Sequence, residues 1–273
     1  MKKLRFYLRK NPELFIGLII TGFMFALIVF GSIFMPYDPD AMDNASKFAS
    51  PSAAHILGCD NFGRDVFSRL IVGARTTLLV ATGTVAIGTV IGIIVGALTG
   101  YYGGIVDEVL MRFNDAVLAF PSILLALVFI SILDGTGTGT AKVVLSLGIV
   151  FAPSFARIIR GEFMKSRNLD YVRSARLMGA SDIRIMFVHI LPNTLPVLFS
   201  SIVIGFNNAV LAEAGMSYLG LGVQPPQSSL GQMLSNAQVF LLSAPLGAII
   251  PGVTLALMVL GFSFLSDGIE KLG

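Results

Sequence analysis

The sequence predicts an all-α membrane protein with six transmembrane helices. Of its 273 residues, 55% are hydrophobic and only 13% are charged, and the mean hydropathy is +0.82. An average soluble domain has a charged fraction of about 25%. The hydrophobic residues gather into runs, each long enough to span the roughly 30 Å core of a bilayer. Lipid is therefore the expected solvent for most of the chain.

The expected spans follow one another along the chain. They cover residues 14–34, 76–99, 116–133, 141–159, 190–212 and 240–266. The first run follows a basic segment, as in a signal peptide, but it is long enough to cross the bilayer and no small-residue cleavage site follows it. We therefore expect a retained helix, and six crossings place both termini on the same side.

The distribution of Lys and Arg predicts the orientation of the chain. If the N-terminus is cytosolic, the inner segments hold 14 of these residues and the outer segments hold five. Cytosolic segments of membrane proteins are enriched in basic residues, so both termini are expected in the cytosol. We divide the chain into residues 1–75, comprising a tail, the first span and an external loop, and residues 76–273, a core of five spans.

The second span carries a regular series of glycines. They are Gly88, Gly92, Gly96 and Gly100. A spacing of four places them along one face of a helix, where a second helix backbone can approach closely. We expect this face to pack against another helix of the same chain.

Several kinds of chemistry are missing from the sequence. It contains neither the G-x-x-x-x-G-K-[ST] phosphate loop nor the H-E-x-x-H zinc motif. Its two histidines, His55 and His189, are expected on opposite sides of the membrane, and Cys59 is its only cysteine. The sequence predicts no enzyme active site, no metal site and no cofactor. A net charge of +3 gives no reason to expect nucleic-acid binding.

The interiors of the expected spans are almost free of charged residues. Proton-coupled and ion-coupled carriers need groups inside the membrane that titrate or coordinate. From residue 214 to residue 266 the chain contains no Asp, Glu, Lys or Arg. This disfavours a proton-driven carrier and indicates that energy comes from a partner.

The longest inner segment predicts two short helices. The first contains Asp170 and ends at Gly179, because glycine commonly stops a helix, and Tyr171, Ala175 and Met178 lie near one of its faces. Ser181 can cap the second helix.

The second helix carries an apolar stripe at positions i, i+3, i+4 and i+7. The stripe consists of Ile183, Met186, Phe187 and Ile190. A partner protein that grips the hairpin explains this pattern, and an interfacial helix lying on anionic lipid explains it equally well.

The same segment resembles the EAA loop of ABC importer permeases, whose pattern is Glu-Ala-Ala, three residues, Gly, nine residues, Ile-x-Leu-Pro. Four positions match it: Ala175, Gly179, Leu191 and Pro192. Arg173 stands in place of the Glu, so the implied docking depends on shape and apolar contact. The resemblance implies a loop at about residues 163–190 that couples to an ATPase subunit. Its implied residues are Asp170, Tyr171, Arg173, Ala175, Gly179, Ala180, Ser181, Met186, Phe187 and Pro192.

A second resemblance lies in residues 57–70. They read L-G-C-D-N-F-G-R-D-V-F-S-R-L and resemble the external L-G-T-D-x-x-G-R-D-x-x-S-R segment of the peptide and nickel branch of these permeases. The matching residues include Gly58, Asp60, Gly63, Arg64 and Asp65. We expect Arg64 and Asp65 to be structural ions of the external loop rather than substrate contacts. Residues 36–39 resemble the second of the two paired permeases.

The resemblance implies a type I permease fold in the cytoplasmic (inner) membrane. It implies a permease subunit of an ABC importer that translocates di- or oligopeptides, or nickel or another metal chelate, while separate subunits hydrolyse ATP. The implied partners are a homologous permease subunit, two ABC ATPase subunits, an extracytoplasmic substrate-binding protein and the lipid bilayer. The alternative is a nucleotide-independent secondary carrier or channel, and nothing in the sequence distinguishes the substrates.

Overall fold

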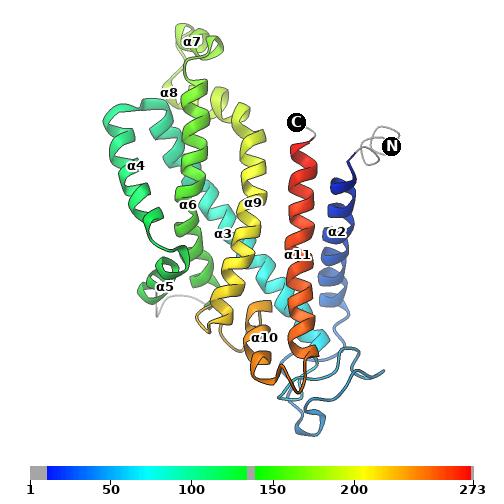
Figure 1. Ribbon diagram of the computed structural model, residues 1–273. Coiled ribbons are helices and arrows are strands. Elements are labelled where there is room, and N and C mark those ends of the chain that lie inside the picture. Colours follow the sequence, from blue (N-terminus) through cyan, green and yellow to red (C-terminus); the bar gives the residue numbers. More distant parts are fainter. Residues whose placement is uncertain (1–10, 134–138, 272–273) are drawn as a thin grey trace. The chain divides into compact units, whose positions relative to one another are not determined.

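The computed structural model describes residues 11–133 and 139–271 (Figure 1). Within these ranges all regular elements are helical, and Cys59 and Asp65 form an isolated β-bridge. The longer helices are α2 (Pro12–Ile33), α3 (Val66–Tyr102), α4 (Gly104–Ala119), α5 (Ser122–Ile132), α6 (Gly139–Ser166), α9 (Leu191–Tyr218) and α11 (Leu246–Glu270). The shorter ones are η1 (Asn44–Ser46), α7 (Asp170–Leu177), α8 (Asp182–Arg184), η2 (Ile185–Ile190), α10 (Leu230–Ala237) and η3 (Gln238–Phe240). The all-α prediction is confirmed. The basic residues before residue 11, which the predicted orientation uses, lie outside the described ranges.

The number of spans depends on how one bent pair of helices is counted. Five of the described helical segments are long and apolar enough to cross a membrane, and α4 with α5 makes a sixth only if the pair is one span. The expected continuous helix over residues 116–133 is wrong, because α4 and α5 meet at 100°. Phe120 is extended and Pro121 precedes α5, which follows from the clash that keeps the residue before a proline out of the helical region.

The expected boundaries shift at three other places. Helix α3 begins at Val66, so residues 66–75 are helical and not part of the external loop. Its start is capped by Asp65, whose Oδ2 accepts a hydrogen bond of 2.7 Å from the backbone N–H of Ser68. Helix α10 forms within the expected external loop after the fifth span, and α11 starts at Leu246 instead of residue 240. The fifth span is part of a helical segment that runs continuously from Asp182 to Tyr218.

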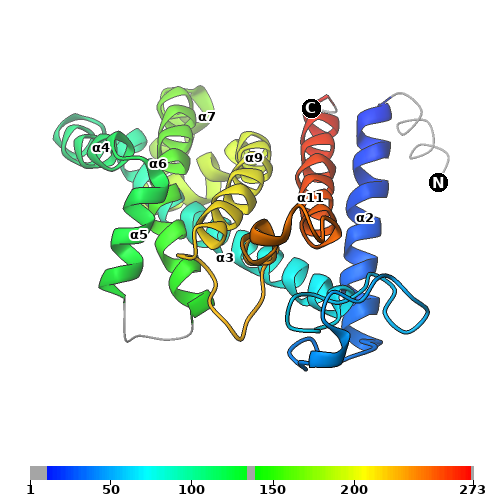
Figure 2. The same cartoon turned by 60° about the horizontal axis from the view of Figure 1, so that its bottom comes forward.

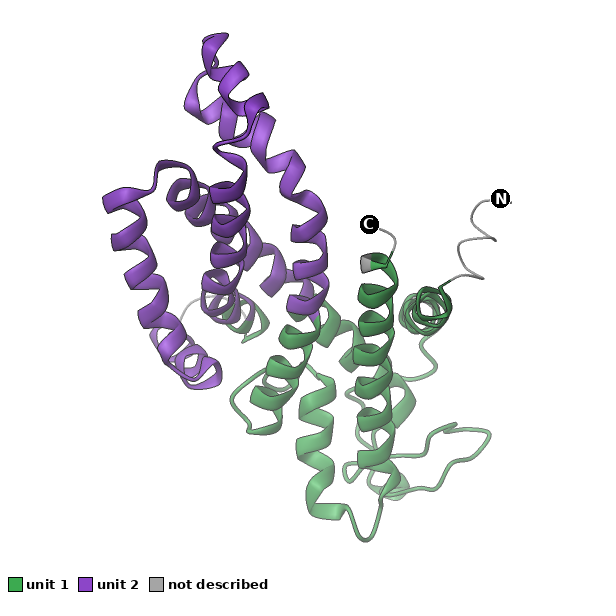
Figure 3. Ribbon diagram, turned by 45° about the horizontal axis from the view of Figure 1, so that its top comes forward, with its two compact units in different colours: residues 1–81, 137–143, 207–272 green, residues 82–136, 144–206, 273 purple. Residues whose placement is uncertain are grey.

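The chain forms two compact units (Figure 3). Unit 1 comprises residues 1–81, 137–143 and 207–272, and unit 2 comprises residues 82–136 and 144–206 with residue 273. In unit 1, α2 and α11 lie side by side (Figures 1 and 2). Glu13 near the start of α2 pairs with Lys271 just after α11. These two ends of the helix pair therefore lie together, and their cytosolic location stays a prediction, as does the division at residue 75.

In unit 2, the glycine face of α3 packs directly on α6. A methyl group on Gly96 would come within 2.6 Å of the Ala156 carbonyl oxygen and 2.7 Å of Ile159 Cβ, and one on Gly100 within 2.6 Å of Phe163 Cβ. Such separations are shorter than van der Waals contact, so only glycine fits. The expected packing within the chain is confirmed.

Two ion pairs join α4 to α6 in the same unit. The Arg160 guanidinium donates to both carboxylate oxygens of Asp107, at 2.5 and 2.6 Å, and Arg157 donates to Asp115 at 2.5 Å. Bidentate arginine–carboxylate pairs fix the relative orientation of their helices. They also explain how α6 carries two arginines at the end of an apolar span.

Candidate functional site

The turn between the two helices predicted at residues 170–190 forms at Gly179, but the second helix is not short, because it continues to Tyr218. We call residues 170–190 the hairpin. Helix α7 ends at Leu177, and Gly179, two residues beyond, has a φ of +83°, a left-handed conformation that glycine adopts without strain. The backbone N–H of Gly179 donates to the Arg176 carbonyl at 3.0 Å, and that of Ala180 donates to the Ala175 carbonyl at 3.1 Å. These two bonds satisfy carbonyls that the helix end leaves free. Ser181 then caps α8, its Oγ accepting from the Arg184 N–H at 3.4 Å.

The Gly179 turn yields a direct prediction about the stability of the hairpin. A Cβ at this position would meet nothing within 4 Å, so the strain of a substitution comes from the backbone alone. We expect Gly179→Val to destabilise the turn by about 1–2 kcal/mol and to make the hairpin more sensitive to trypsin, which cleaves after exposed arginines. Gly179→Asn, which tolerates this conformation better, is the matched control. Equal trypsin sensitivity of the wild type and the valine variant would contradict the backbone argument.

The hairpin buries a different set of residues from those the spacing predicts. Val172, Ala175, Ile185, Met186 and Ile190 lie in one core cluster with residues of α3 and α6. The expected face of Tyr171, Ala175 and Met178 is therefore wrong, and so is the single stripe, because Met186 and Ile190 are buried while Ile183 and Phe187 are exposed.

The physical reason for this difference is a change of helix type. Residues Ile185–Ile190 form a π-helix, and the backbone N–H of Leu191 donates to the Met186 carbonyl, five residues back. A π-helix has more residues per turn than an α-helix, so the 3.6-residue spacing that defined the stripe does not apply.

The residues implied by the EAA resemblance divide by exposure. Asp170, Tyr171, Arg173, Gly179, Ser181, Phe187 and Pro192 are exposed, Ala180 is half-buried, and Ala175 and Met186 are buried.

The most exposed apolar side chains at the turn are Leu177, Met178 and Ile183, with 89%, 80% and 67% of their surface accessible. We call these three the apolar tip. Leu177 is not among the residues that the EAA resemblance implies, although its position at the end of α7, two residues before Gly179, is a signal for exposure.

The external segment is organised around the carboxylate of Asp60. Its Oδ1 accepts from the backbone N–H groups of Phe62 and Arg64, at 2.8 and 3.0 Å, and its Oδ2 accepts from Arg64 Nε at 2.7 Å. Gly58 and Gly63 have φ angles of +77° and +76°, which let the chain turn tightly on both sides of Asp60.

Arg64 and Asp65 are ions with different contacts: Arg64 pairs with Asp60 inside the loop, whereas Asp65 connects the loop to the start of α3. Besides capping α3, Asp65 contacts His55, with 2.9 Å between Oδ1 and Nδ1. Arg64 and Asp65 are almost fully buried. These contacts support the expected structural role of both residues.

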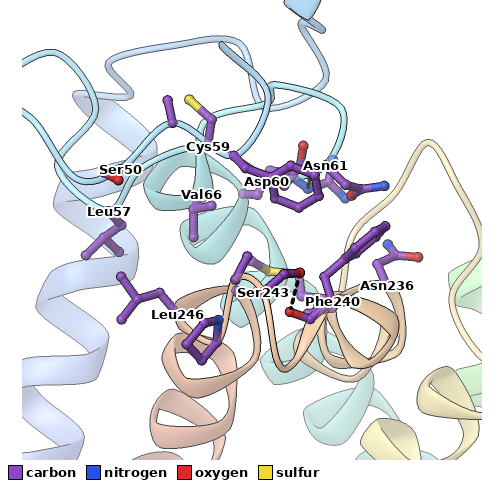
Figure 4. A pocket seen from close by; sticks show the side chains of 18 of the residues that line it. Ser50, Leu57, Cys59, Asp60, Asn61, Val66, Asn236, Phe240, Ser243 and Leu246 are labelled. Atoms are coloured by element: carbon purple, nitrogen blue, oxygen red, sulfur yellow. Dashed lines mark hydrogen bonds and ion pairs between the residues drawn. The ribbon is translucent and has the colours of Figure 1, made fainter.

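A cavity of about 300 Å³ lies in unit 1 between this loop and the segment that joins α10 to α11. Leu57, Cys59, Phe240 and Leu246 line it (Figure 4). Burial, together with the carboxylates of Asp65, Asp60 and Asp43, raises the pKa of the Cys59 thiol, so this thiol stays protonated and weakly nucleophilic at neutral pH.

Among residues 11–133 and 139–271, no three His, Cys, Asp or Glu side chains lie close enough together to hold a metal ion.

Residues 88–272 match the family described as "Binding-protein-dependent transport system inner membrane component". Residues 2–51 match the N-terminal TM domain of oligopeptide transport permease C. The chain is 39% identical over 269 residues to the glutathione transport system permease protein GsiD of Pectobacterium atrosepticum, covering 97% of this chain and 87% of that protein. It is 34% identical over 271 residues to the dipeptide transport system permease protein DppC of Haemophilus influenzae, covering 97% and 91%.

Solved structures show the same fold. A chain of the inward-facing MetNI methionine ABC transporter superposes with a TM-score of 0.62 at 23% identity, covering 75% of this chain and 95% of that chain. An amino acid ABC transporter with histidines gives a TM-score of 0.58 at 18% identity, covering 75% and 94%. The family model and the named permease relatives, rather than these structures, show that the chain is a multi-pass inner-membrane permease subunit and not an enzyme. It belongs to the family of binding-protein-dependent transport system inner membrane components, the permeases of ABC importers.

Proposed function

We propose that this permease carries small peptides, of the size of dipeptides to glutathione, and that separate ATPase subunits drive it through the apolar tip. The named relatives are permeases of dipeptide and glutathione systems, and their identity to this chain extends over nearly its whole length. Small peptides are for this reason preferred to nickel or another metal chelate.

The observation that carries the ATPase proposal is the apolar tip itself. Leu177, Met178 and Ile183 are the most exposed apolar residues of the hairpin, whereas five others are packed in a core: Val172, Ala175, Ile185, Met186 and Ile190. Exposed apolar side chains that gather on a protruding element favour burial against a partner. The base of the hairpin is packed against α3 and α6, so docking orders little additional backbone and loses little conformational entropy.

The hairpin is suited to transmit movement. Ala175 and Met186 are buried against α3 and α6 and therefore anchor the base of the hairpin. The tip is left exposed and contacts the ATPase. Two ATPase subunits that approach each other on binding ATP would move the docked hairpins of this permease and its homologous partner. Movement of packed helices between two arrangements then opens the path to one side at a time. An extracytoplasmic binding protein delivers the peptide to the external loops.

The test is a double substitution at the tip. We expect Leu177→Asp with Met178→Asp to weaken ATPase binding at least about 100-fold, because charges replace two apolar anchors, and to abolish ATP-dependent peptide uptake. Arg173→Glu is the matched control, since Arg173 is exposed on the same helix and lies outside the tip. Binding is measured by co-purification and uptake in proteoliposomes.

The outcomes separate this proposal from its alternatives. Full ATPase binding by the double variant would contradict docking through the tip. Loss of binding to anionic vesicles, with ATPase binding retained, would favour the interfacial-helix interpretation. Peptide uptake without any ATPase would favour a secondary carrier or channel.

A further inference from the structure

The C-terminal end of α3 contacts the hairpin through the hydroxyl of Tyr101. This hydroxyl donates a hydrogen bond to Asp182 Oδ1 at 2.6 Å and accepts one from Arg176 Nη2 at 2.8 Å. Arg176 lies in the last turn of α7 and Asp182 in the first turn of α8. One phenol oxygen therefore joins α3 to both arms of the hairpin, on the two sides of Gly179.

The chemistry of this position favours tyrosine. A guanidinium can only donate hydrogen bonds and a carboxylate can only accept them, whereas a hydroxyl does both at once. Because each partner is charged, both bonds are charge-assisted and stronger than neutral ones. The Tyr101 ring belongs to the buried core cluster that includes Phe163 and Val172. Phenylalanine would fill the same space and make neither bond.

A second contact holds the last turn of α3. Arg167, which follows α6, donates from Nη1 to the Gly100 carbonyl at 3.3 Å. Carbonyls in the last turn of a helix have no partner inside the helix, and a cation there also interacts favourably with the helix dipole. The end of α3 is thus bonded to the chain both before and after α7.

We propose that Tyr101 is a positioning residue that transmits displacement of the hairpin to α3. The two bonds lie on opposite sides of the turn, so they resist rotation of the hairpin about the end of α3. Without these two bonds, the hairpin can move with the ATPase while α3 stays in place. This inference rests on the proposed function, in which the ATPase moves the hairpin.

The test compares two adjacent tyrosines in the complete transporter, reconstituted with its ATPase subunits and its binding protein. We expect Tyr101→Phe to keep ATPase binding and to raise the ATP hydrolysed per peptide taken up about fivefold, since two charge-assisted bonds to partly solvated groups are lost. Tyr102→Phe is the control. Tyr102 is 50% exposed, and the hydroxyl that bonds Arg176 and Asp182 is that of Tyr101. The ratio of this control should equal that of the wild type.

A double-mutant cycle with Asp182→Ala distinguishes transmission from general damage. If Tyr101 and Asp182 act through one bond, the double variant should be no more uncoupled than the stronger single variant. Additive effects, an unchanged ratio in Tyr101→Phe, an equal change in Tyr102→Phe, or loss of ATPase binding in Tyr101→Phe would each overturn the inference. The proposed function fails on a different result, namely full ATPase binding by the tip variant.

Discussion

Replacing Gly96 by alanine is expected to destabilise the protein by about 1–3 kcal/mol, the usual range for overpacking a close contact, and replacement by leucine should prevent correct folding. The added methyl group would lie 2.6 Å from the Ala156 carbonyl oxygen and 2.7 Å from Ile159 Cβ. Both neighbours are buried, and one contact is to backbone, so α3 and α6 must separate. Thermal denaturation in detergent measures the effect.

Gly161 provides the matched control for this prediction. It lies inside α6, and a Cβ there would meet nothing within 4 Å. Alanine is favoured over glycine in helices by roughly 0.5–1 kcal/mol, so Gly161→Ala should leave the melting temperature unchanged or raise it. The same chemical change is thus expected to have opposite signs at the two positions. Similar melting temperatures for Gly96→Ala and the wild type would show that the α3–α6 contact is looser than described.

The second large effect is expected at Glu213, which is fully buried in α9. Its Oε2 accepts from Thr77 Oγ1 at 2.8 Å and its Oε1 from Ser217 Oγ at 2.7 Å. Thr77 Oγ1 in turn accepts from the backbone N–H of Leu230 at 3.2 Å. One carboxylate therefore connects α3, α9 and the start of α10.

We expect Glu213→Leu to destabilise the protein by about 2–3 kcal/mol, because it leaves two buried hydroxyls without their acceptor. Glu213→Gln keeps an acceptor oxygen and should be less damaging. Glu108→Gln, on the exposed face of α4, is the control and should have little effect. The melting temperatures of the three variants, each compared with that of the wild type, measure these effects. Equal damage from Gln and Leu would mean that the charge itself, and not hydrogen bonding, holds the three helices.

Local signals in the sequence predicted several features correctly. The glycine spacing of α3, the stop at Gly179 and the cap at Ser181 each depend on neighbours in the chain, and all three appear in the structure. The start of α3 differs from the sequence prediction. Asp65 is a residue type that commonly caps helices, but the polar composition of residues 36–75 favours a loop throughout.

Other features depended on contacts between segments far apart in the chain. The partners of Arg160 and Glu213 lie 53 and 136 residues away, so no local pattern reveals them. The burial of Ile185 together with Ile190 accompanies a π-helix, whose five-residue hydrogen-bond spacing places both residues on one side, against the core cluster.

What the amino-acid order established is the class of protein, most of its long apolar helices and the glycine turn at Gly179, because hydropathy and turn chemistry act between near neighbours. Which apolar residues of the hairpin form the exposed tip, and which hydroxyl joins it to α3, depended on three-dimensional packing. A side chain is buried or exposed only with respect to segments that the fold brings beside it. The tip of Leu177, Met178 and Ile183 and the bonds of Tyr101 are therefore properties of the folded chain.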